Sequence, residues 1–315
     1  MSNFFTWTSD AASGTWVNSA YSANIRKAAI AQTLGMKFVT PENGYGKNKG
    51  ESVDIQRFSK LTVPTTGQLS EFIDIPIDKM TAARTRITVA EWGRGVEVTE
   101  KSVDLSYFKL TDVAEFLLKD QMSQILDTAV WAAFRTNKTK YIPTGAAAGT
   151  FDTDGTASTT ATANFNMFHL AKIRDYASDT LNMPTFRDGK YICVLGTQAA
   201  RGIKSDPSWI NYHLNENAWY AGINGVLGEV ENTILIECNN TTAFRKVGTA
   251  SVLGEAMFFG ADAVSQITAL DPEMRYTTAG GGRFRAVLWY GLLNFGLVWP
   301  TATAGEERVI HVTSA

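Results

Sequence analysis

The sequence contains little cysteine and little histidine. Its 315 residues include 2 cysteines, Cys193 and Cys238, and 3 histidines, His169, His213 and His311. Two cysteines 45 positions apart cannot supply a disulfide framework or a cysteine-rich zinc module. The histidines stand far apart in the sequence, so none belongs to a histidine pair with metal-site spacing. We therefore expect no metal site and no bound cofactor.

The chain also lacks an excess of charge of one sign. It has 29 lysines and arginines against 31 aspartates and glutamates, which gives a net charge of −2. A protein built mainly to hold nucleic acid normally needs a basic face, so this balance argues against that class. Apolar residues make up 44% of the chain and charged residues 19%. This composition predicts a folded chain with a substantial core and room for more than one domain.

No long hydrophobic run is present. The most apolar stretch, residues 286–299, is interrupted by Asn294. A membrane-spanning helix needs about 20 apolar residues, so this shorter stretch predicts buried core and no membrane association. The first residues, MSNFFTW, lack the basic region and apolar run of a signal peptide, and we expect a reducing cytoplasm as the compartment of synthesis.

Motifs that carry chemistry are missing as well. The glycines of GYGKNKG at residues 44–50 suggest a phosphate loop, but a strand-like segment follows where a helix is required. The DTDG at residues 152–155 begins like a calcium loop but lacks the closing glutamate. No Gly-x-Ser-x-Gly occurs, and Cys193 lies in an apolar strand where it should be inert packing. We expect no catalytic residue and no enzymatic activity.

Two segments near the start carry apolar side chains without an obvious core of their own. Residues 1–50 scatter large aromatic residues among Ser, Thr, Asn and Gly, with a helix predicted only over residues 22–34. Residues 51–100 then alternate apolar and polar residues, as strands do, at 53–55, 61–63, 69–77, 87–89 and 96–98. A two-stranded ribbon is marginal in water, so both segments should need a partner surface.

The remainder of the chain predicts a mixed helix and strand architecture. The spacing of apolar residues predicts a long helix over residues 112–136, with Asp112 and Glu115 as a capping box. A second helix is predicted over 164–181. Buried strands are predicted at 190–195 and 233–238, and further strands at 252–260, 284–299 and 308–313. The fold class is therefore α+β.

Several segments together resemble the major capsid proteins of tailed bacteriophages, which have the Hong Kong 97-type fold. The similar segments are KNKGESVDIQRF (47–58), DGKYICVL (188–195) with DPSW (206–209), GINGVLGEVENTILIE (222–237), EAMFFG (255–260) and GRFRAVLWYG (282–291). The branch that the chain resembles most is the one found in podoviruses that carry a large virion RNA polymerase.

This resemblance implies a domain organisation. Residues 1–50 would form an N-terminal arm and residues 51–105 an extended β-hairpin loop. A peripheral domain would comprise 106–186 and 262–315, with the spine helix at 112–136, and an axial domain would comprise 187–261. Some relatives form a lysine–asparagine crosslink, which Lys79 in the extended loop could in principle make, although we do not expect it to.

The resemblance also implies function and partners. Copies would assemble, through a procapsid that matures, into hexamers and pentamers of an icosahedral shell in the host bacterial cytoplasm, and the virion would enclose double-stranded DNA contacted weakly and non-specifically. Scaffolding, portal and decoration proteins would be further partners. The hypothesised subunit contacts are aromatic, apolar and arginine side chains of the arm, the loop and the axial domain: Phe4, Phe5, Trp7, Trp16, Arg57, Phe58, Phe72, Ile75, Trp92, Arg94, Trp209, Trp219 and Tyr220.

Three other functions compete with this one. An encapsulin, the shell of a cellular compartment, has the same fold and encloses cargo protein. A tail-tube or other virion component would form rings. A β-rich carbohydrate-active enzyme would stack sugars on the aromatic residues of 209–220, and it would require a carboxylate pair near them.

Overall fold

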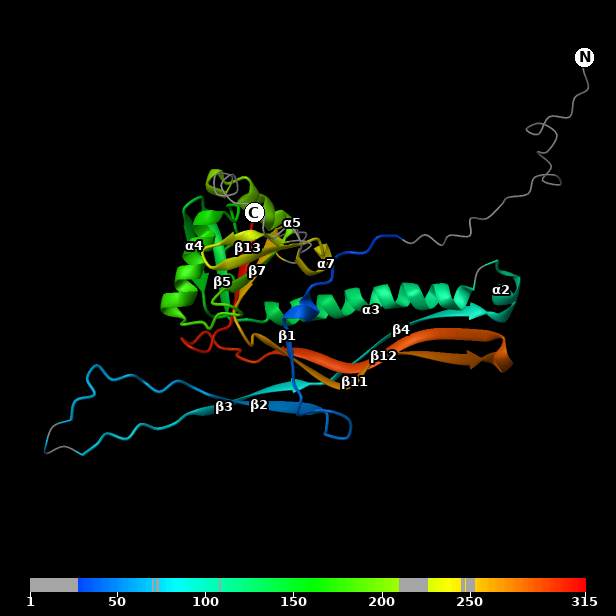
Figure 1. Ribbon diagram of the computed structural model, residues 1–315, viewed down its shortest axis with the longest axis horizontal. Helices are drawn as coiled ribbons and strands as arrows, with labels where there is room; N and C mark the ends of the chain where they lie inside the picture. Colours follow the sequence, from blue (N-terminus) through cyan, green and yellow to red (C-terminus); the bar gives the residue numbers. More distant parts are fainter. Residues whose placement is uncertain are drawn as a thin grey trace, which may run out of the picture. The chain divides into compact units, whose positions relative to one another are not determined.

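The structure, a computed structural model, describes residues 28–69, 71, 74–107, 109–209, 226–244, 247 and 253–315. The chain divides into two units, Met1–Ile30 and Ala31–Ala315, and every helix and strand described lies in the second. Two larger sheets, one two-stranded ribbon and a long helix make up this second unit (Figure 1). The α+β prediction is confirmed.

The larger sheet has seven strands in the order β6-β5-β13-β10-β7-β9-β8. Three central strands are buried along their whole length, as expected for continuous apolar runs covered on both faces. The predicted strands at 190–195 and 233–238 are confirmed within one residue. The strands are β5 (Thr139–Gly145), β6 (Ala148–Asp152), β7 (Tyr191–Gly196), β8 (Val226–Val230), β9 (Thr233–Cys238), β10 (Gly254–Phe259) and β13 (Val309–Ser314).

Short helices pack against this sheet. Asn166 caps α4 (Met167–Asp175) by accepting a hydrogen bond from the His169 backbone N–H, and a π-helical turn, η2 (Tyr176–Thr180), continues it. The helix predicted over 164–181 is therefore present. Helix α5 (Thr197–Lys204) follows β7 directly, and α7 (Thr241–Phe244) follows β9.

The second sheet has four strands in the order β1-β11-β12-β4. Strands β11 (Val264–Ala279) and β12 (Phe284–Leu297) form a long hairpin, and β1 (Val39–Pro41) and β4 (Ala90–Thr99) are its edge strands. The hairpin turns through η4 (Gly280–Gly282), where all three glycines have positive φ, which side chains disfavour. Val96 and Val98 were predicted in the ribbon, but β4 pairs with β12 instead.

Helix α3 (Leu110–Arg135) connects the two sheets. Its first half packs Ala114 and Leu118 on Val287 and Trp289 of β12. Its second half carries Trp131 and Phe134 into the core beside the seven-stranded sheet, with Trp131 against Phe244 of α7 (ring centroids 4.7 Å) and Phe134 against Phe259 of β10 (4.8 Å). The predicted long helix is confirmed within two residues of each end.

The predicted capping box of this helix is wrong. Lys109 is the N-cap residue, without a side-chain hydrogen bond, so Asp112 lies inside the first turn. Glu115 instead pairs with Lys119 and accepts a hydrogen bond from the Tyr276 hydroxyl of β11. A short helix, α2 (Glu100–Leu105), precedes α3 and is capped by Thr99. Glu115 thus contacts a distant strand that the local sequence pattern does not contain.

The two-stranded ribbon consists of β2 (Ser52–Phe58) and β3 (Ala82–Thr88). One face carries Asp54 and Arg86, joined by hydrogen bonds of 2.7 and 2.9 Å. The opposite face packs Ile87 against the flat surface at Gly296 of β12, and the Thr85 hydroxyl donates to the Val298 carbonyl. The alternation of the sequence therefore places one face of the ribbon on β12.

Two further expectations fail. The predicted strands at 61–63 and 69–77 are absent from the described residues of the loop between β2 and β3. The helix predicted over 22–34 is not formed at residues 28–34, and its first part lies outside the described residues. A short 3-10 turn, η1 (Gly35–Phe38), follows there, and the buried carboxylate of Asp127 accepts the backbone N–H groups of Leu34 and Gly35 (2.8 and 2.6 Å).

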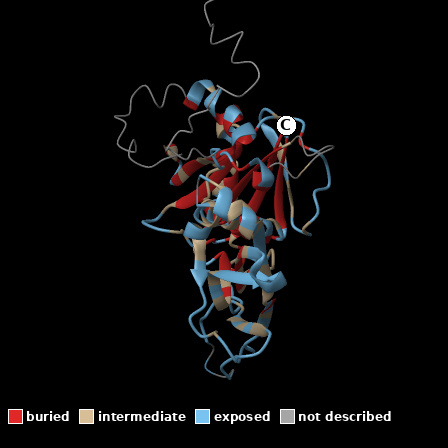
Figure 2. Cartoon of the chain, turned by 90° about the vertical axis from the view of Figure 1, so that its right-hand side faces the viewer, coloured by how far each residue is buried: buried red, intermediate tan, exposed pale blue. Residues whose placement is uncertain are grey.

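Burial is concentrated around the seven-stranded sheet, whereas the ribbon and its loop toward the bottom of the view are mostly exposed (Figure 2). Strands β5, β6 and β13 hydrogen-bond into this sheet together with strands of residues 187–261. The sheet therefore contains strands from both predicted domains. The boundaries of these domains remain a prediction.

Candidate interaction surfaces

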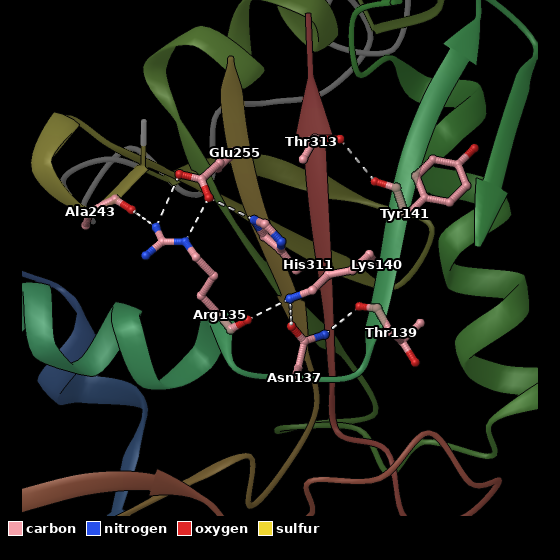
Figure 3. A network of polar contacts seen from close by, with 9 residues as sticks. All are labelled: Arg135, Asn137, Thr139, Lys140, Tyr141, Ala243, Glu255, His311 and Thr313. Atoms are coloured by element: carbon pink, nitrogen blue, oxygen red, sulfur yellow. Dashed lines mark hydrogen bonds and ion pairs between the residues drawn. The ribbon is translucent and has the colours of Figure 1, made fainter. Parts of the chain in front are cut away.

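A buried polar network lies where the end of α3 meets the seven-stranded sheet (Figure 3). The carboxylate of Glu255 on β10 receives Arg135 Nε at 2.9 Å and Nη2 at 3.2 Å, and lies 2.9 Å from His311 Nε2 on β13. Burial alone would raise the pKa of Glu255, but the hydrogen bonds from His311 and Arg135 hold it below its ordinary value. Burial lowers the pKa of His311, so the charged pair is Arg135–Glu255 and the imidazole is neutral.

A second set of polar groups continues this network toward β5. Lys140 Nζ donates to the Arg135 carbonyl (2.6 Å) and to Asn137 Oδ1 (2.9 Å), and Thr139 Oγ1 donates to Glu307 Oε2 (3.0 Å). Burial lowers the pKa of Lys140 to about 8 and raises the pKa of Glu307 to about 7.

These groups with shifted pKa values join helix α3 to the seven-stranded sheet. Each is hydrogen-bonded to backbone or side chains of the helix–sheet junction. No group of three potential metal ligands occurs among the described residues. The pairing of Glu255 with Arg135 and His311 positions α3 on the sheet, while His311 Nδ1 is buried without a hydrogen-bond partner among the described residues.

The aromatic residues that favoured a carbohydrate-active enzyme divide into two groups. Trp209 is buried in the core beside the seven-stranded sheet, with Leu235 and Phe258 in the same cluster. Its ring is therefore not displayed for stacking on a sugar. Trp219 and Tyr220 lie outside the described residues. Cys193 is buried as predicted, and burial raises the pKa of its thiol, which leaves it unreactive.

The loop between β2 and β3 displays apolar side chains to solvent. Ile77 is 95% exposed and Ile75 is 71% exposed. Among the described residues of this loop, Leu61, Val63, Leu69 and Met80 are exposed as well. So many large apolar side chains on one protruding segment are typical of an interaction surface.

The predicted contact residues of this region take different positions. Phe58, at the end of β2, is 54% exposed and available to a neighbour, as is Ile75. Arg57 instead turns toward its own chain, where it pairs with Glu306 and lies over the ring of Trp299. Phe72 lies outside the described residues, as do Phe4, Phe5, Trp7 and Trp16 of the arm. Arg57 therefore fixes the root of the loop to its own chain, and its contact with another subunit stays a prediction.

Trp92 and Arg94 line a groove between β4 and α3. The hollow has a volume of about 780 Å³. Trp92 donates from its indole Nε1 to the Leu293 carbonyl (2.9 Å) and packs on the core, and Arg94 is exposed. The other lining residues come mainly from β4 and α3: Gly95, Val96, Gln121, Gln124, Ile125, Thr128, Ala129, Ala132, Asn240 and Thr242.

A third surface was not predicted from the sequence. Exposed apolar residues gather on α2, on the first turns of α3 and at the end of the β11–β12 hairpin: Leu105, Tyr107, Phe116, Leu117, Tyr276 and Phe284. The hydrogen bond from Tyr276 to Glu115 and the ion pair between Arg285 and Glu100 hold these elements together. Adjacent residues of a helix point about 100° apart. Phe116 and Leu117 therefore make the exposed apolar surface of α3 wider than a single narrow stripe along the helix.

Several solved phage capsid structures have a similar fold. The capsid of Ralstonia phage GP4 matches with a TM-score of 0.69 and 16% identity, covering 95% of this chain and 95% of that one. The acid-stable capsid of Helicobacter pylori bacteriophage KHP30 gives 0.72 and 13%, covering 100% and 99%. The Cyanophage Pam1 capsid asymmetric unit gives 0.70 and 14%, covering 96% and 97%.

The chain has the fold of phage capsid chains. This is the Hong Kong 97-type architecture that the sequence resemblance predicted, and the match extends over nearly the whole length of both partners. No protein-family model matches the chain, and no curated protein matches it in sequence. No helix among the described residues is long and apolar enough to span a bilayer.

Proposed function

We propose that the chain is the major capsid protein of a tailed bacteriophage, which self-assembles into hexamers and pentamers of an icosahedral shell around double-stranded DNA. The observation that carries this proposal is the match over 95% or more of both chains to several phage capsids. A fold shared over nearly the whole length of both chains supports the role of a capsid subunit.

The exposed loop supplies a physical reason for assembly. Its apolar side chains, such as Ile75 and Ile77, lie in water in the single chain. Burying apolar area contributes about 25 cal/mol per Å², and a specific interface buries about 800 Å² on each partner. Because each copy both offers a loop and receives one, modest contacts repeated around a closed lattice add to a stable shell. The net charge of −2 limits repulsion between neighbouring copies.

In this proposal, each predicted domain has its own role in the shell. Residues 1–50 act as an arm and residues 51–105 as the extended loop, both reaching neighbouring subunits. Residues 106–186 and 262–315 form the peripheral domain, and residues 187–261 form the axial domain. The proposed contacts include Phe58 and Ile75, which are exposed, and Trp92 and Arg94, which share a groove.

The remaining partners belong to the same proposal. The shell is assembled in the host bacterial cytoplasm as a procapsid, with scaffolding, portal and decoration proteins as further partners, and it matures into the virion. Packaged DNA is contacted weakly, as the absence of net positive charge suggests. The source is a podovirus of the branch with a large virion RNA polymerase, and the subunit has no catalytic role.

Electron microscopy of the purified full-length chain tests this function. Closed, uniform icosahedral particles are expected, and a stable monomer at high concentration would contradict the proposal. Rings or tubes would favour a tail component. Shells filled with cargo protein and no DNA, when purified from the natural source, would favour an encapsulin. Binding of polysaccharides by the monomer would favour the carbohydrate-active enzyme, for which the burial of Trp209 leaves little support.

A further inference from the structure

We propose that the buried side chains of Lys140 and Asn137 in one chain join in an amide bond, with loss of ammonia, as the folded protein ages. This modification site lies where the end of α3 meets the seven-stranded sheet. The structure describes the two side chains before the reaction, which is their state in a freshly folded chain. The inference concerns a single chain, so it goes beyond the proposed function and does not depend on assembly.

The two reacting groups are held in contact. Lys140 Nζ lies 2.9 Å from Asn137 Oδ1, and a C=O bond is about 1.23 Å long, so the amine is no more than about 4.1 Å from the carboxamide carbon Cγ. The carboxamide is fixed because its Nδ2 donates to the carbonyls of Thr139 and Val309. The amine is fixed by its hydrogen bond to the Arg135 carbonyl (2.6 Å). Groups held this close react far faster than the same groups free in solution.

Burial excludes the competing reaction with water. Asn137 is 1% exposed and Lys140 is 7% exposed. In an exposed carboxamide, water can attack Cγ in place of an amine, whereas a closed site limits that attack. A buried ammonium group is also costly, and the amide that replaces it is neutral. Burial of the pair therefore favours the new bond over hydrolysis and over the separate charged amine.

The amine is set to react near neutral pH. Burial lowers the pKa of Lys140 from its ordinary value of 10.5 to about 8. The charge of Arg135 acts in the same direction, and the charges of Glu307 and Glu255 oppose it. His311, the neighbour of Lys140 on β13, is neutral. A large share of the amine is therefore uncharged and nucleophilic at pH 8, where an exposed lysine is almost entirely charged.

A proton acceptor lies beside the amine. His311 is paired with Lys140 in the register of β13 and β5, and Figure 3 shows the imidazole between the Glu255 carboxylate and the Lys140 amine. Its Nε2 lies 2.9 Å from Glu255 Oε1, so Nε2 carries the hydrogen. The other nitrogen, Nδ1, then has a free electron pair, and it is buried without a hydrogen-bond partner among the described residues. Such a base can take up a proton through one intervening water.

The reaction balances without another reactant. The nitrogen of Lys140 bonds to Cγ of Asn137, and the bond between Cγ and Nδ2 breaks. One proton of the amine passes by way of His311 to Nδ2, which leaves as ammonia. Each chain reacts once and turns over no substrate, so the bond is a modification of the chain by itself.

Mass spectrometry of the full-length chain tests the proposal. Folded chains kept at pH 9, above the pKa of Lys140, should each lose one ammonia, and digestion should give a fragment in which residues 137 and 140 are joined. The same chains at pH 6 should react at least five-fold more slowly. Chains in denaturant at pH 9 should give at least five-fold less of the joined fragment, because unfolding separates the pair. A folded chain that keeps its full mass at pH 9, or that loses ammonia without giving the joined fragment, would overturn the proposal.

Variants identify the reacting groups. Lys140→Arg keeps the positive charge but lacks the amine, so the joined fragment should disappear. The matched control is Lys138→Arg, which changes an exposed lysine between the two partners and should leave the rate within about two-fold of the parent. His311→Gln, checked for folding by circular dichroism, should slow the reaction at least ten-fold, since a general base contributes about 10²–10⁴-fold. A folded His311→Gln chain that reacts at the parental rate would overturn the role of His311 as proton acceptor.

Discussion

Arg57 of β2 and Glu306, which precedes β13 in the chain, form an ion pair with 3.4 Å between Nη1 and Oε2. The two side chains are only 12% and 9% exposed. The guanidinium groups of Arg57 and Arg308 both lie over the ring of Trp299, at 5.9 and 5.0 Å from its centre. The root of the exposed loop is therefore fastened to the segment before β13, although 249 positions separate the two charges.

Replacing Arg57 with alanine should loosen the ribbon. The change leaves the Glu306 carboxylate nearly buried without its cation, which costs about 1–3 kcal/mol. Hydrogen–deuterium exchange should become faster in β2 and β3 while β7 and β10 keep their protection. Arg84→Ala is the matched control, because Arg84 pairs with Asp54 on the solvent-facing side of the same ribbon. Equal exchange in both variants would show that the pair does not hold the ribbon.

Glu307 should make stability depend on pH. Burial raises its pKa to about 7 from the ordinary value of 4.5, so the fold favours the protonated carboxyl group. The stability gained from this group is present below pH 4.5 and is lost as the pH rises through 7. Glu307→Gln keeps the neutral form at every pH. We expect its melting temperature to match the parent near pH 4.5 and to exceed it by a few degrees at pH 8, corresponding to about 1–3 kcal/mol.

Lys140 should give a pH dependence of stability with the opposite sign. Burial lowers its pKa to about 8, so the fold favours the neutral amine. The related stability is present above pH 10.5 and is lost as the pH falls through 8. Because the charge of Lys140 lowers the pKa of Glu307, Lys140→Met should keep a pH dependence with the sign expected for Glu307 and move it to higher pH. If Glu307→Gln and the parent respond identically between pH 4.5 and pH 8, Glu307 is not the titrating group.

Glu255→Gln should destabilise the junction between α3 and the seven-stranded sheet. The variant keeps the size of the side chain but leaves the Arg135 guanidinium without a counter-charge, at a cost of about 3–5 kcal/mol for a broken buried pair. Thermal unfolding monitored by calorimetry measures this loss. Glu229→Gln, which disrupts the more exposed pair with Lys190, should cost much less. Similar losses in both variants would argue against a special role for Glu255.

The two thiols should resist alkylation in the folded protein. Burial raises the pKa of Cys193 strongly and that of Cys238 to about 11, so little thiolate forms at neutral pH. Iodoacetamide followed by mass measurement should find both thiols unmodified in the native chain and modified in denaturant. Rapid labelling of the native chain would contradict the buried placement of these residues.

Elements whose pattern is local and long could be predicted from the sequence. The apolar period of α3 and the continuous apolar run of β9 are visible without knowledge of the neighbours, because each side chain packs where its own period directs it. The resemblance added the fold, which local patterns alone do not specify.

Contacts that depend on distant segments could not be predicted. The alternation of residues 69–77 is that of a strand, and a strand needs a partner backbone. The single chain supplies no such partner at its described positions. The indole of Trp92 donates to the Leu293 carbonyl, which lies 201 positions away in sequence, and its contact with a neighbour stays a prediction. Asp127 lies on the apolar side of its helix. The sequence around it does not indicate that its carboxylate binds the backbone N–H groups of residues 34 and 35.

The position of β13 between β10 and β5 has a consequence for synthesis. A ribosome produces β5, β7, β9 and β10 before the strand that joins two of them, so the sheet cannot close on a growing polypeptide. Only after residues 309–314 have left the exit tunnel can the subunit acquire its finished form. Unfinished chains are thereby kept out of any lattice that recognises the completed sheet.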